Sequence, residues 1–236
     1  MKNLKSLLRN SFPGVYISVK NLFYFLYGIF TGKKHHRVIF EKIYKTNSWM
    51  DDESRSGSGS NLENTLNIRR ELPLLVKGLN IKSLVDIPCG DFYWMQKVNT
   101  DVNSYTGADI VPELINNNQK LYGNEKRKFI LLDLTEDNLP AADLILCRDC
   151  LPHLSFKNIF SAIDRIKKSG SGYLLTSTYI NRELNRDIET GLFRPLNLQL
   201  PPFNFPEPLK LIEDKCIDKR KTLEDKMLGL WQIKDL

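Results

Sequence analysis

Hydrophobic residues in the second part of this chain fall into short runs that alternate with longer amphipathic stretches. From residue 81 onward, helix-like stretches such as Pro112–Tyr122 and Phe156–Lys167 separate the apolar runs. Strands that alternate with helices indicate parallel pairing through right-handed crossovers. Each of five runs is predicted to form a buried strand: Ser83–Ile87, Ser104–Ile110, Lys128–Leu134, Asp143–Arg148 and Gly172–Tyr179.

Two further runs near the end, Leu209–Ile217 and Met227–Lys234, predict a closing antiparallel pair. The predicted fold class is therefore α/β: a doubly wound, Rossmann-like, mostly parallel sheet of about seven strands with a C-terminal antiparallel pair.

The region before the first strand contains a change of composition. Residues 51–60 (DDESRSGSGS) are polar and rich in Gly and Ser, as in linkers. Ser60 and Glu63 have the spacing of a capping box, which predicts that a helix begins there. Pro73 is expected to kink or restart this helix and Gly78 to end it.

We therefore expect a basic and apolar arm over residues 1–43 and a main domain over 44–236. Within the main domain, 44–80 form N-terminal cap helices, and 81–236 form the core with a long loop at 180–208.

The net charge of +6 is concentrated in the N-terminal arm. Residues 1–50 hold nine Lys or Arg and one acid, a net +8, so the remainder of the chain is −2. A mildly acidic main body offers no broad surface for a phosphate backbone, so we expect no nucleic-acid partner.

The arm also contains the apolar run Leu22–Phe30, which is too short to span a bilayer, since spanning requires about twenty residues. Two alternatives stay open for residues 12–37: an interfacial helix in peripheral contact with a membrane, or a helix that packs on the main domain. No cleavage site follows the run, and the four cysteines do not make a disulfide framework at this length. We expect a cytoplasmic protein, with the inner face of the membrane as the alternative.

The first three predicted strands each end in an acid, Asp86, Asp109 and Asp133. Their spacings of 23 and 24 residues each correspond to about one βα unit. Ligands of such sheets bind beyond the carboxyl ends of the strands, so the three carboxylates are expected to line one ligand site.

The turn after the first strand, Asp86-Ile87-Pro88-Cys89-Gly90-Asp91, indicates the kind of ligand. A dinucleotide site requires G-x-G-x-x-G, and this turn retains only Gly90. We expect Asp91 to face a pyrophosphate and repel it. A ligand that is positively charged and has no phosphate fits this turn better.

This turn, D-x-P-C-G-D, resembles the D-x-G-x-G turn of class I S-adenosylmethionine (SAM) methyltransferases. The resemblance implies that Asp86 lies near the methionine amino group and that Pro88 and Gly90 form the turn against the cofactor. It implies that Asp109 binds the ribose hydroxyls and Asp133 the adenine amino group, with Ile110 and Leu134 packing on adenine.

Four longer strings resemble a group of bacterial methyltransferases that often accompany genes for surface polysaccharides. They are W-x-x-x-E-S-R-S-G-S-G-S from Trp49, D-I-P-C-G-D-F-Y-W-M, C-R-D-C-L-P-H-L and N-L-x-L-P-P-F, all within residues 44–236. This resemblance implies SAM as cofactor and S-adenosylhomocysteine as product, with Arg148 beside the cofactor. Arg55, Ser56 and Gly57 either fold over the cofactor carboxylate or belong to a flexible linker.

Asp149 and His153 follow the fourth predicted strand, where a transferred methyl group would leave the cofactor. A hydroxyl acceptor benefits from a base that removes its proton. We expect His153 to be that base and Asp149 to be a base or an orienting group. The alternative is that His153 only caps the following helix or closes the pocket.

The loop 180–208 is rich in Pro, aromatic and polar residues, as expected of a lid over the acceptor. Together with Trp94, four of its residues are candidate acceptor contacts: Asp187, Arg194, Asn197 and Phe203. The alternative is a structural excursion that covers the sheet. We hypothesise methyl transfer to an oxygen of a small polar or sugar-like acceptor.

Three other functions are weighed against this hypothesis. Zinc bound by Cys89, Cys147, Cys150 and His153 would form a complete ligand set, but we expect no metal. The domain could instead bind the cofactor without catalysis, as a partner subunit, or be a nicotinamide-dependent oxidoreductase, which the turn disfavours. The sequence does not specify the oligomeric state.

Overall fold

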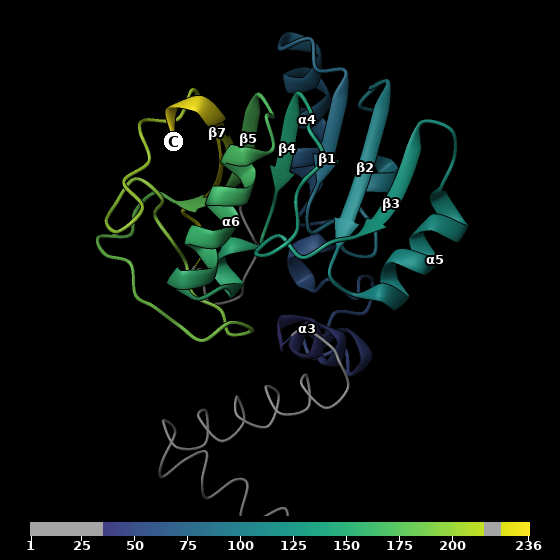
Figure 1. Cartoon of the computed structure of the whole chain (residues 1–236), viewed down its shortest axis with the longest axis horizontal. Coiled ribbons are helices and arrows are strands. Elements are labelled where there is room, and N and C mark those ends of the chain that lie inside the picture. Colours follow the sequence, from purple (N-terminus) through teal and green to yellow (C-terminus); the bar gives the residue numbers. More distant parts are fainter. Residues whose placement is uncertain (1–34, 215–222) are drawn as a thin grey trace, which may run out of the picture.

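The computed structural model describes residues 35–214 and 223–236. A seven-stranded sheet in the order β3-β2-β1-β4-β5-β7-β6 forms its centre (Figure 1). Strands β1 to β5 pair in parallel, and β7 is antiparallel to both β5 and β6. The predicted fold class is confirmed. The strands are β1 Ser83–Asp86, β2 Ser104–Asp109, β3 Arg127–Leu131, β4 Leu144–Cys147, β5 Tyr173–Tyr179, β6 Lys210–Glu213 and β7 Lys226–Gln232.

Helices cover both faces of the sheet because successive strand residues point to opposite sides. Helices α4 (Leu66–Gly78) and α5 (Pro112–Tyr122) pack with Leu84, Leu144 and Leu146 in one core cluster. Helix α6 (Phe156–Lys168) packs on the other face, with Val85 and Ile145. Figure 1 shows α6 in front of the sheet and α4 behind it.

The N-terminal boundaries differ from those expected. Helix α4 begins at Leu66, after Thr65, and in the turn before it Asn61 rather than Ser60 accepts a hydrogen bond from Asn64 N. It continues through Pro73 and ends at Gly78. Strand β3 ends at Leu131, so Asp133 lies in the loop that follows it.

Helix α3 (His35–Lys45) contains the boundary that the sequence suggested between arm and domain. It lies across the carboxyl ends of the parallel strands in Figure 1 and packs on the main domain through Phe40 and through Ile39 beside Gly191. Residues 35–43 therefore belong to the same structural unit as the sheet, whereas the run Leu22–Phe30, on which the two alternatives rest, lies outside the described residues. Among residues 35–214 and 223–236, every helix is too short or too polar to cross a bilayer.

Candidate functional site

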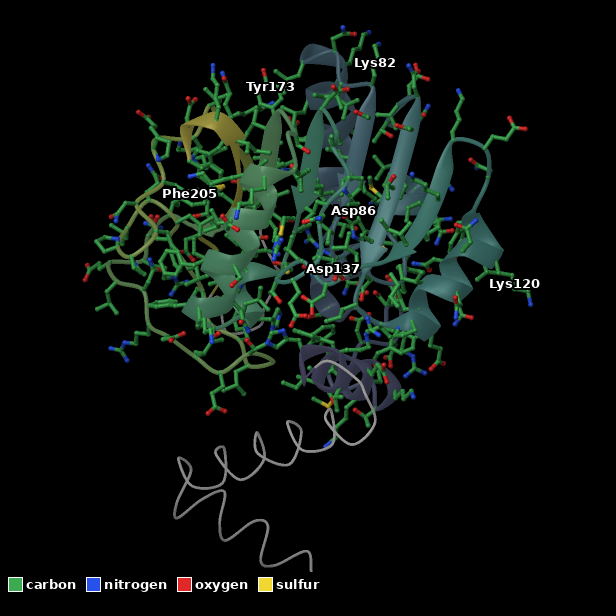
Figure 2. The ribbon with its side chains drawn as sticks, in the orientation of Figure 1. Lys82, Asp86, Lys120, Asp137, Tyr173 and Phe205 are labelled. Atoms are coloured by element: carbon green, nitrogen blue, oxygen red, sulfur yellow. The ribbon has the colours of Figure 1, made fainter. Side chains whose placement is uncertain are left out.

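A cavity of about 330 Å³ opens at the carboxyl edge of the parallel strands, between the strand ends and α3. Figure 2 shows Asp86 near this edge, whereas Lys82 and Tyr173 lie at the opposite end of the sheet. The cavity is lined by the ends of β1 and β2, the loops after β3 and β4, residues 55–60 and one side of α3. Tyr179, Phe193 and Lys226 complete the lining from the C-terminal half.

Three acids meet at this rim, as the sequence predicted. Asp86, Asp109 and Asp133 all line the cavity, and each is at most 6% exposed. Parallel register aligns β1 with β2, with Asp86 opposite Gly107, so their final residues reach the same edge. Ile110 and Leu134, the expected neighbours of adenine, also line it.

Burial makes the first two acids weak. The pKa of Asp86 is raised to about 7 by burial, although the hydrogen bond from Tyr105 Oη at 2.6 Å opposes the shift. Burial likewise raises the pKa of Asp109 to about 6, against hydrogen bonds from Val111 N and Gly90 N. These carboxylates are held where a bound cation would stabilise their charged form.

Asp133 behaves differently, although its side chain is only 2% exposed. Burial alone would raise its pKa, but the nearby His36 imidazole and the hydrogen bonds from Thr135 outweigh burial, and the pKa is lowered. Oδ1 accepts from Thr135 N at 2.9 Å and from Thr135 Oγ1 at 2.7 Å. Oδ2 has no hydrogen-bond partner among the described residues, so one buried, charged acceptor is left open beside the cavity.

The turn after β1 is fixed by a glycine. Gly90 has φ +55°, and a Cβ there would lie 2.2 Å from Ser56 Oγ, so a side chain cannot be accommodated without displacing the neighbouring loop. Pro88, which follows a cis peptide bond, and Gly90 both line the cavity.

Asp91 does not face a ligand as the sequence suggested. It is not part of the cavity lining, because its carboxylate accepts hydrogen bonds from Ser54 Oγ at 3.0 Å and from Arg55 N at 2.7 Å. The repulsion of a pyrophosphate by Asp91, expected from the sequence, therefore does not apply. Asp91 instead holds the serine-rich segment against the β1 turn.

That segment is packed and is not a free linker. Ser54 is 1% exposed, and Arg55, Ser56 and Gly57 line the cavity. Gly57 has φ +88°, and a Cβ there would lie 2.9 Å from Trp49 Cβ, so this glycine allows Trp49 to pack against the segment. The three predicted residues thus lie where they can contact a bound ligand.

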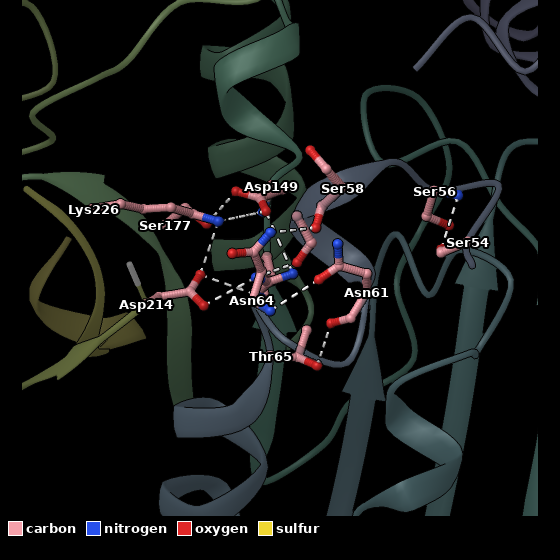
Figure 3. A network of polar contacts seen from close by, with 12 residues as sticks. Ser54, Ser56, Ser58, Asn61, Asn64, Thr65, Asp149, Ser177, Asp214 and Lys226 are labelled. Atoms are coloured by element: carbon pink, nitrogen blue, oxygen red, sulfur yellow. Dashed lines mark hydrogen bonds and ion pairs between the residues drawn. The ribbon is translucent and has the colours of Figure 1, made fainter. Parts of the chain in front are cut away.

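Four charged side chains interlock beside the C-terminal half of the cavity, and Figure 3 shows three of them, Asp149, Asp214 and Lys226. Arg148 donates to Asp214 through Nε and Nη2, both at 2.9 Å, and to Gly59 O at 2.7 Å. Lys226 Nζ lies 2.6 Å from Asp149 Oδ2 and 3.0 Å from Asp214 Oδ2. Asp149 is 27% exposed, against at most 4% for the other three, so it is the most accessible charge of the four.

The two predicted catalytic residues, Asp149 and His153, differ in how the surrounding charges affect their ability to accept a proton. Burial opposes ionisation of Asp149, but Lys226 and Arg148 outweigh it and hold its pKa well below the ordinary value. Such a carboxylate is a weak base, which favours the orienting role of Asp149 over the alternative in which it takes the proton from a hydroxyl. Its orienting and electrostatic role is compatible with the structure.

His153 is in the protonation state that a base requires. Its Nδ1 lies 2.9 Å from Leu192 O, and because a carbonyl only accepts, Nδ1 carries the proton and Nε2 the free lone pair. Burial lowers the pKa of His153, although Asp149 opposes the shift. The imidazole is neutral near pH 7 and lines the cavity.

Aromatic rings form a continuous wall around this histidine. His153 lies 5.4 Å from Trp49 and 5.4 Å from Phe193, centroid to centroid, and Phe193 lies 6.4 Å from Tyr179. All four line the cavity and come from four separate segments. We call Trp49, His153, Phe193 and Tyr179 the aromatic wall.

The residues that the sequence assigned to the acceptor lie elsewhere, with the exception of Trp94. Trp94 lines the cavity with the Arg148 guanidinium 5.4 Å from its ring. The other four are absent from the lining and have structural partners. Arg194 donates to the carbonyl oxygens of Leu151, Pro152 and Leu154, and Asn197 accepts from Gln199 N.

Asp187 caps the N-terminus of α6 through Phe156 N, and Phe203 packs on Phe156 and Phe160. The geometry corrects the expectation that these four side chains bind the acceptor, and it favours the alternative in which the segment covers the sheet. Its backbone still matters for the site, because Leu192 O sets the proton of His153.

The cysteine set weighed for zinc does not converge among the described residues. The one group of three metal-ligating side chains found there is His36, Asp133 and Glu136, whose ligand atoms lie within 4.8 Å of one another. Cys89, Cys147 and Cys150 are free thiols, and Asn118 Nδ2 lies 3.8 Å from Cys89 Sγ.

Sequence reasoning missed several residues of the site. His36 and Phe40 come from the arm that had been separated from the domain, and Tyr179, Phe193 and Lys226 carry no recognisable motif. A lone Lys at the start of the apolar run 226–231 is a signal that could have been read, since a buried lysine requires acidic partners.

No protein-family model and no curated sequence matches this chain, so its relatives are found by structure. The N-methyltransferase NodS from Bradyrhizobium japonicum WM9 superposes with a TM-score of 0.50 at 15% identity, over 71% of this chain and 98% of that one. The methyltransferase domain of bacterial CtHen1-CN gives 0.50 at 10% identity, over 73% and 100%.

A further structure, the methyltransferase domain of bacterial CtHen1-C, is matched over 50% of this chain and 66% of that one, with a TM-score of 0.44 and 14% identity. At these identities the likeness to the first two establishes the fold. The chain has the Rossmann-like α/β fold found in those methyltransferase structures.

Proposed function

We propose that this protein is a SAM-dependent methyltransferase that acts on an oxygen of a small polar or sugar-like acceptor. The observation that carries the proposal is the rim of three buried carboxylates, of which Asp133 keeps one oxygen unpaired beside the cavity. A buried, unpaired carboxylate oxygen is costly unless a ligand donor satisfies it.

The residues present fit this cofactor. Asp86 and Asp109 offer negative charge to a cationic ligand and to ribose hydroxyls, and Asp133 Oδ2 offers an acceptor to the adenine amino group. Ile110 and Leu134 supply apolar contacts. Gly90 keeps the turn free of a side chain where the ligand would approach backbone, and Arg55, Ser56 and Gly57 face the cavity across from that turn. Bound SAM would supply a methyl group activated by its sulfonium.

His153 would accept the proton that the acceptor hydroxyl loses in the reaction. In O-methylation the acceptor oxygen forms a bond to the methyl carbon, the carbon–sulfur bond breaks, and the hydroxyl proton must be taken up. Nε2 of His153 carries the free lone pair for that proton. The nearby Asp149 carboxylate stabilises the imidazolium that results.

Two features support a polar, sugar-like acceptor. The aromatic wall offers ring faces on which the C–H face of a sugar can stack, and Asp149 presents a permanently charged acceptor for its hydroxyls. Arg148, Lys226, Asp149 and Asp214 sum to zero charge, which favours an uncharged acceptor over an ionic one. The resemblance to methyltransferases encoded beside surface-polysaccharide genes points to the same class.

We also propose that the protein works in the cytoplasm, at or near the inner face of the membrane. The basic and apolar composition of residues 12–37 supports peripheral contact with anionic lipid. All but His35, His36 and Arg37 of that range lie outside the described residues.

Calorimetry of the full-length protein against S-adenosylhomocysteine and against NAD tests the proposal. We expect saturable binding of S-adenosylhomocysteine and none of NAD. Binding of NAD alone would exclude the methyltransferase. Binding of S-adenosylhomocysteine without labelled-methyl transfer to any cell-surface glycan precursor would instead favour a non-catalytic, cofactor-binding subunit.

A further inference from the structure

Helix α3 contributes one side of the cofactor cavity, although it precedes every motif of the domain. Its residues His36, Phe40 and Tyr44, spaced four apart, all line the cavity. Phe40 packs against both core clusters, so the helix bridges the two faces of the sheet at the cavity mouth. Ile39 anchors the other side of the helix beside Gly191, where an added Cβ would lie 2.5 Å from Ile39 Cγ2.

His36 forms the middle of a chain of hydrogen bonds that ends on Asp133. The Asn158 amide, from α6, lies with Nδ2 2.9 Å from His36 Nε2 and donates to Thr190 Oγ1 at 2.7 Å. Because this amide nitrogen is a donor, Nε2 accepts and Nδ1 carries the proton. Nδ1 lies 3.3 Å from Thr135 Oγ1, which itself donates to Asp133 Oδ1 at 2.7 Å.

The same imidazole N–H lies 3.8 Å from the other Asp133 oxygen, Oδ2, which is beyond hydrogen-bond distance. Oδ1 is therefore saturated by Thr135, while Oδ2 receives the electrostatic support of His36 and keeps its acceptor capacity. Donors aligned in one direction along such a chain strengthen one another. The chain fixes which of the two carboxylate oxygens is turned to the ligand.

We propose that His36 is a positioning residue for cofactor recognition: it holds Asp133 so that the unpaired Oδ2 reads the exocyclic amino group of adenine. This inference rests on the proposed function, in which the cavity binds SAM. A base with a carbonyl in place of the amino group would set two acceptors against each other, so the site selects adenine over hypoxanthine. Through His36, helix α3 thereby contributes to the specificity for the adenine base of the cofactor.

The three side chains His36, Asp133 and Glu136 also have the composition of a cation site. The directions of the hydrogen bonds favour the adenine role, because Nδ1 of His36, the atom nearest Asp133, carries a proton and cannot ligate a metal in that state. A bound divalent cation is thus an alternative that the experiment must separate.

The test uses two probes, S-adenosylhomocysteine and its hypoxanthine analogue S-inosylhomocysteine, titrated by calorimetry into the full-length protein. For the wild type we expect a preference for the adenine compound of roughly 10- to 100-fold, the range of a hydrogen bond to a buried charge. His36→Ala should lower affinity for the adenine compound about tenfold and leave the inosine compound within about twofold, so that most of the preference disappears.

His36→Asn is the conservative variant, since its amide nitrogen occupies nearly the position of Nδ1 and still donates to Thr135. On a logarithmic scale, this variant should regain at least half of the wild-type preference for S-adenosylhomocysteine over S-inosylhomocysteine. Lys45→Ala, at an exposed position of the same helix, is the matched control and should behave as wild type. A common melting temperature for all four proteins excludes loss of the fold.

The outcomes are distinct. Wild type that binds neither probe rejects the proposed function itself. Wild type that prefers adenine, with a preference that His36→Ala leaves unchanged, overturns the role of His36 while the proposed function stands. Dependence of S-adenosylhomocysteine binding on added zinc, abolished by EDTA and by His36→Ala, would also overturn it in favour of a cation site.

Discussion

The two halves of the cavity differ in net charge: one is acidic and the other is neutral. At the cofactor half, three buried acids stand at the ends of β1 and β2 and in the loop after β3, and burial raises the pKa of the first two. At the acceptor half, Arg148, Lys226, Asp149 and Asp214 neutralise one another, and the exposed surface is mainly aromatic. One half is built to receive positive charge and the other to receive an uncharged surface.

Under the proposed function, this difference would let one cavity order two ligands. A cationic cofactor gains most at the acidic rim, whereas a neutral polar acceptor avoids the desolvation of a net charge and stacks on the rings. The two halves are also built from different parts of the fold. The strand ends and the loops directly after them position the acids, whereas the segments around Trp49, His153 and Phe193 position the rings. Variants should therefore separate cleanly into those that affect cofactor binding and those that affect turnover.

The largest effect is expected at the acceptor half, from His153→Ala. Loss of the base should lower methyl transfer by roughly 10²–10⁴-fold, because the free Nε2 of His153 is the proton acceptor assigned to this half of the cavity. Affinity for S-adenosylhomocysteine should stay within about threefold. The measurement is labelled-methyl transfer to glycan precursors, and a loss below about tenfold would reduce His153 to a structural residue.

Lys226→Met removes the cation between two carboxylates. Asp149 and Asp214 would then share Arg148 alone, and breaking a buried ionic network in this way costs about 3–5 kcal/mol of unfolding free energy. Chemical denaturation measures the change. Lys234→Met, at an exposed position near the C-terminus, is the matched control and should cost less than about 0.5 kcal/mol. Equal effects of both substitutions would contradict the interlocked network.

Asp109→Ala tests the cofactor half alone. Loss of charge-assisted hydrogen bonds to ribose should weaken S-adenosylhomocysteine binding by roughly 1.5–3 kcal/mol. Asp164→Ala, which removes an acid half-exposed on α6, should leave the affinity unchanged. If Asp109→Ala binds as tightly as the wild type, the assignment of the β2 acid to the ribose is wrong.

The smallest effect is a pH dependence. The pKa of Asp86 is about 7 and that of Asp109 about 6, both raised above 3.8, so the folded protein holds protons that the unfolded chain releases. Their contribution to stability without ligand is therefore fully present below about pH 4 and is lost as the pH rises through 6 and 7.

A bound ammonium group favours the ionised carboxylates, so cofactor binding should release protons. Calorimetry near pH 6.5 in two buffers of different ionisation enthalpy should detect up to about one proton released, and near pH 8.5 none. The Asp86→Asn variant should lose most of the release. An absence of release at both pH values would mean that the raised pKa values do not describe the binding site.

Much of the cofactor half could be predicted from the sequence. The apolar runs and the spacing of Asp86, Asp109 and Asp133 were sufficient because parallel strands of similar length must deliver their last residues to one edge. Gly90 was recognisable because its neighbours in the turn are bulky. In contrast, the local signals at Ser60 and Asp91 predicted the wrong partners. The adjacent Asn61 accepts the bond in place of Ser60, and the distant Arg55 N donates to Asp91.

The acceptor half was decided only by the tertiary structure. Asp187, Arg194, Asn197 and Phe203 have the composition of a binding loop, yet they bond to the backbone and rings that they cover. Trp49, Phe193 and Lys226 meet across long separations in the chain, and nothing in their immediate sequence records that meeting. The sequence by itself determined what strand order and spacing impose; the fold decided which side chains from distant loops share a cavity, because burial and charge pairing depend on neighbours in space.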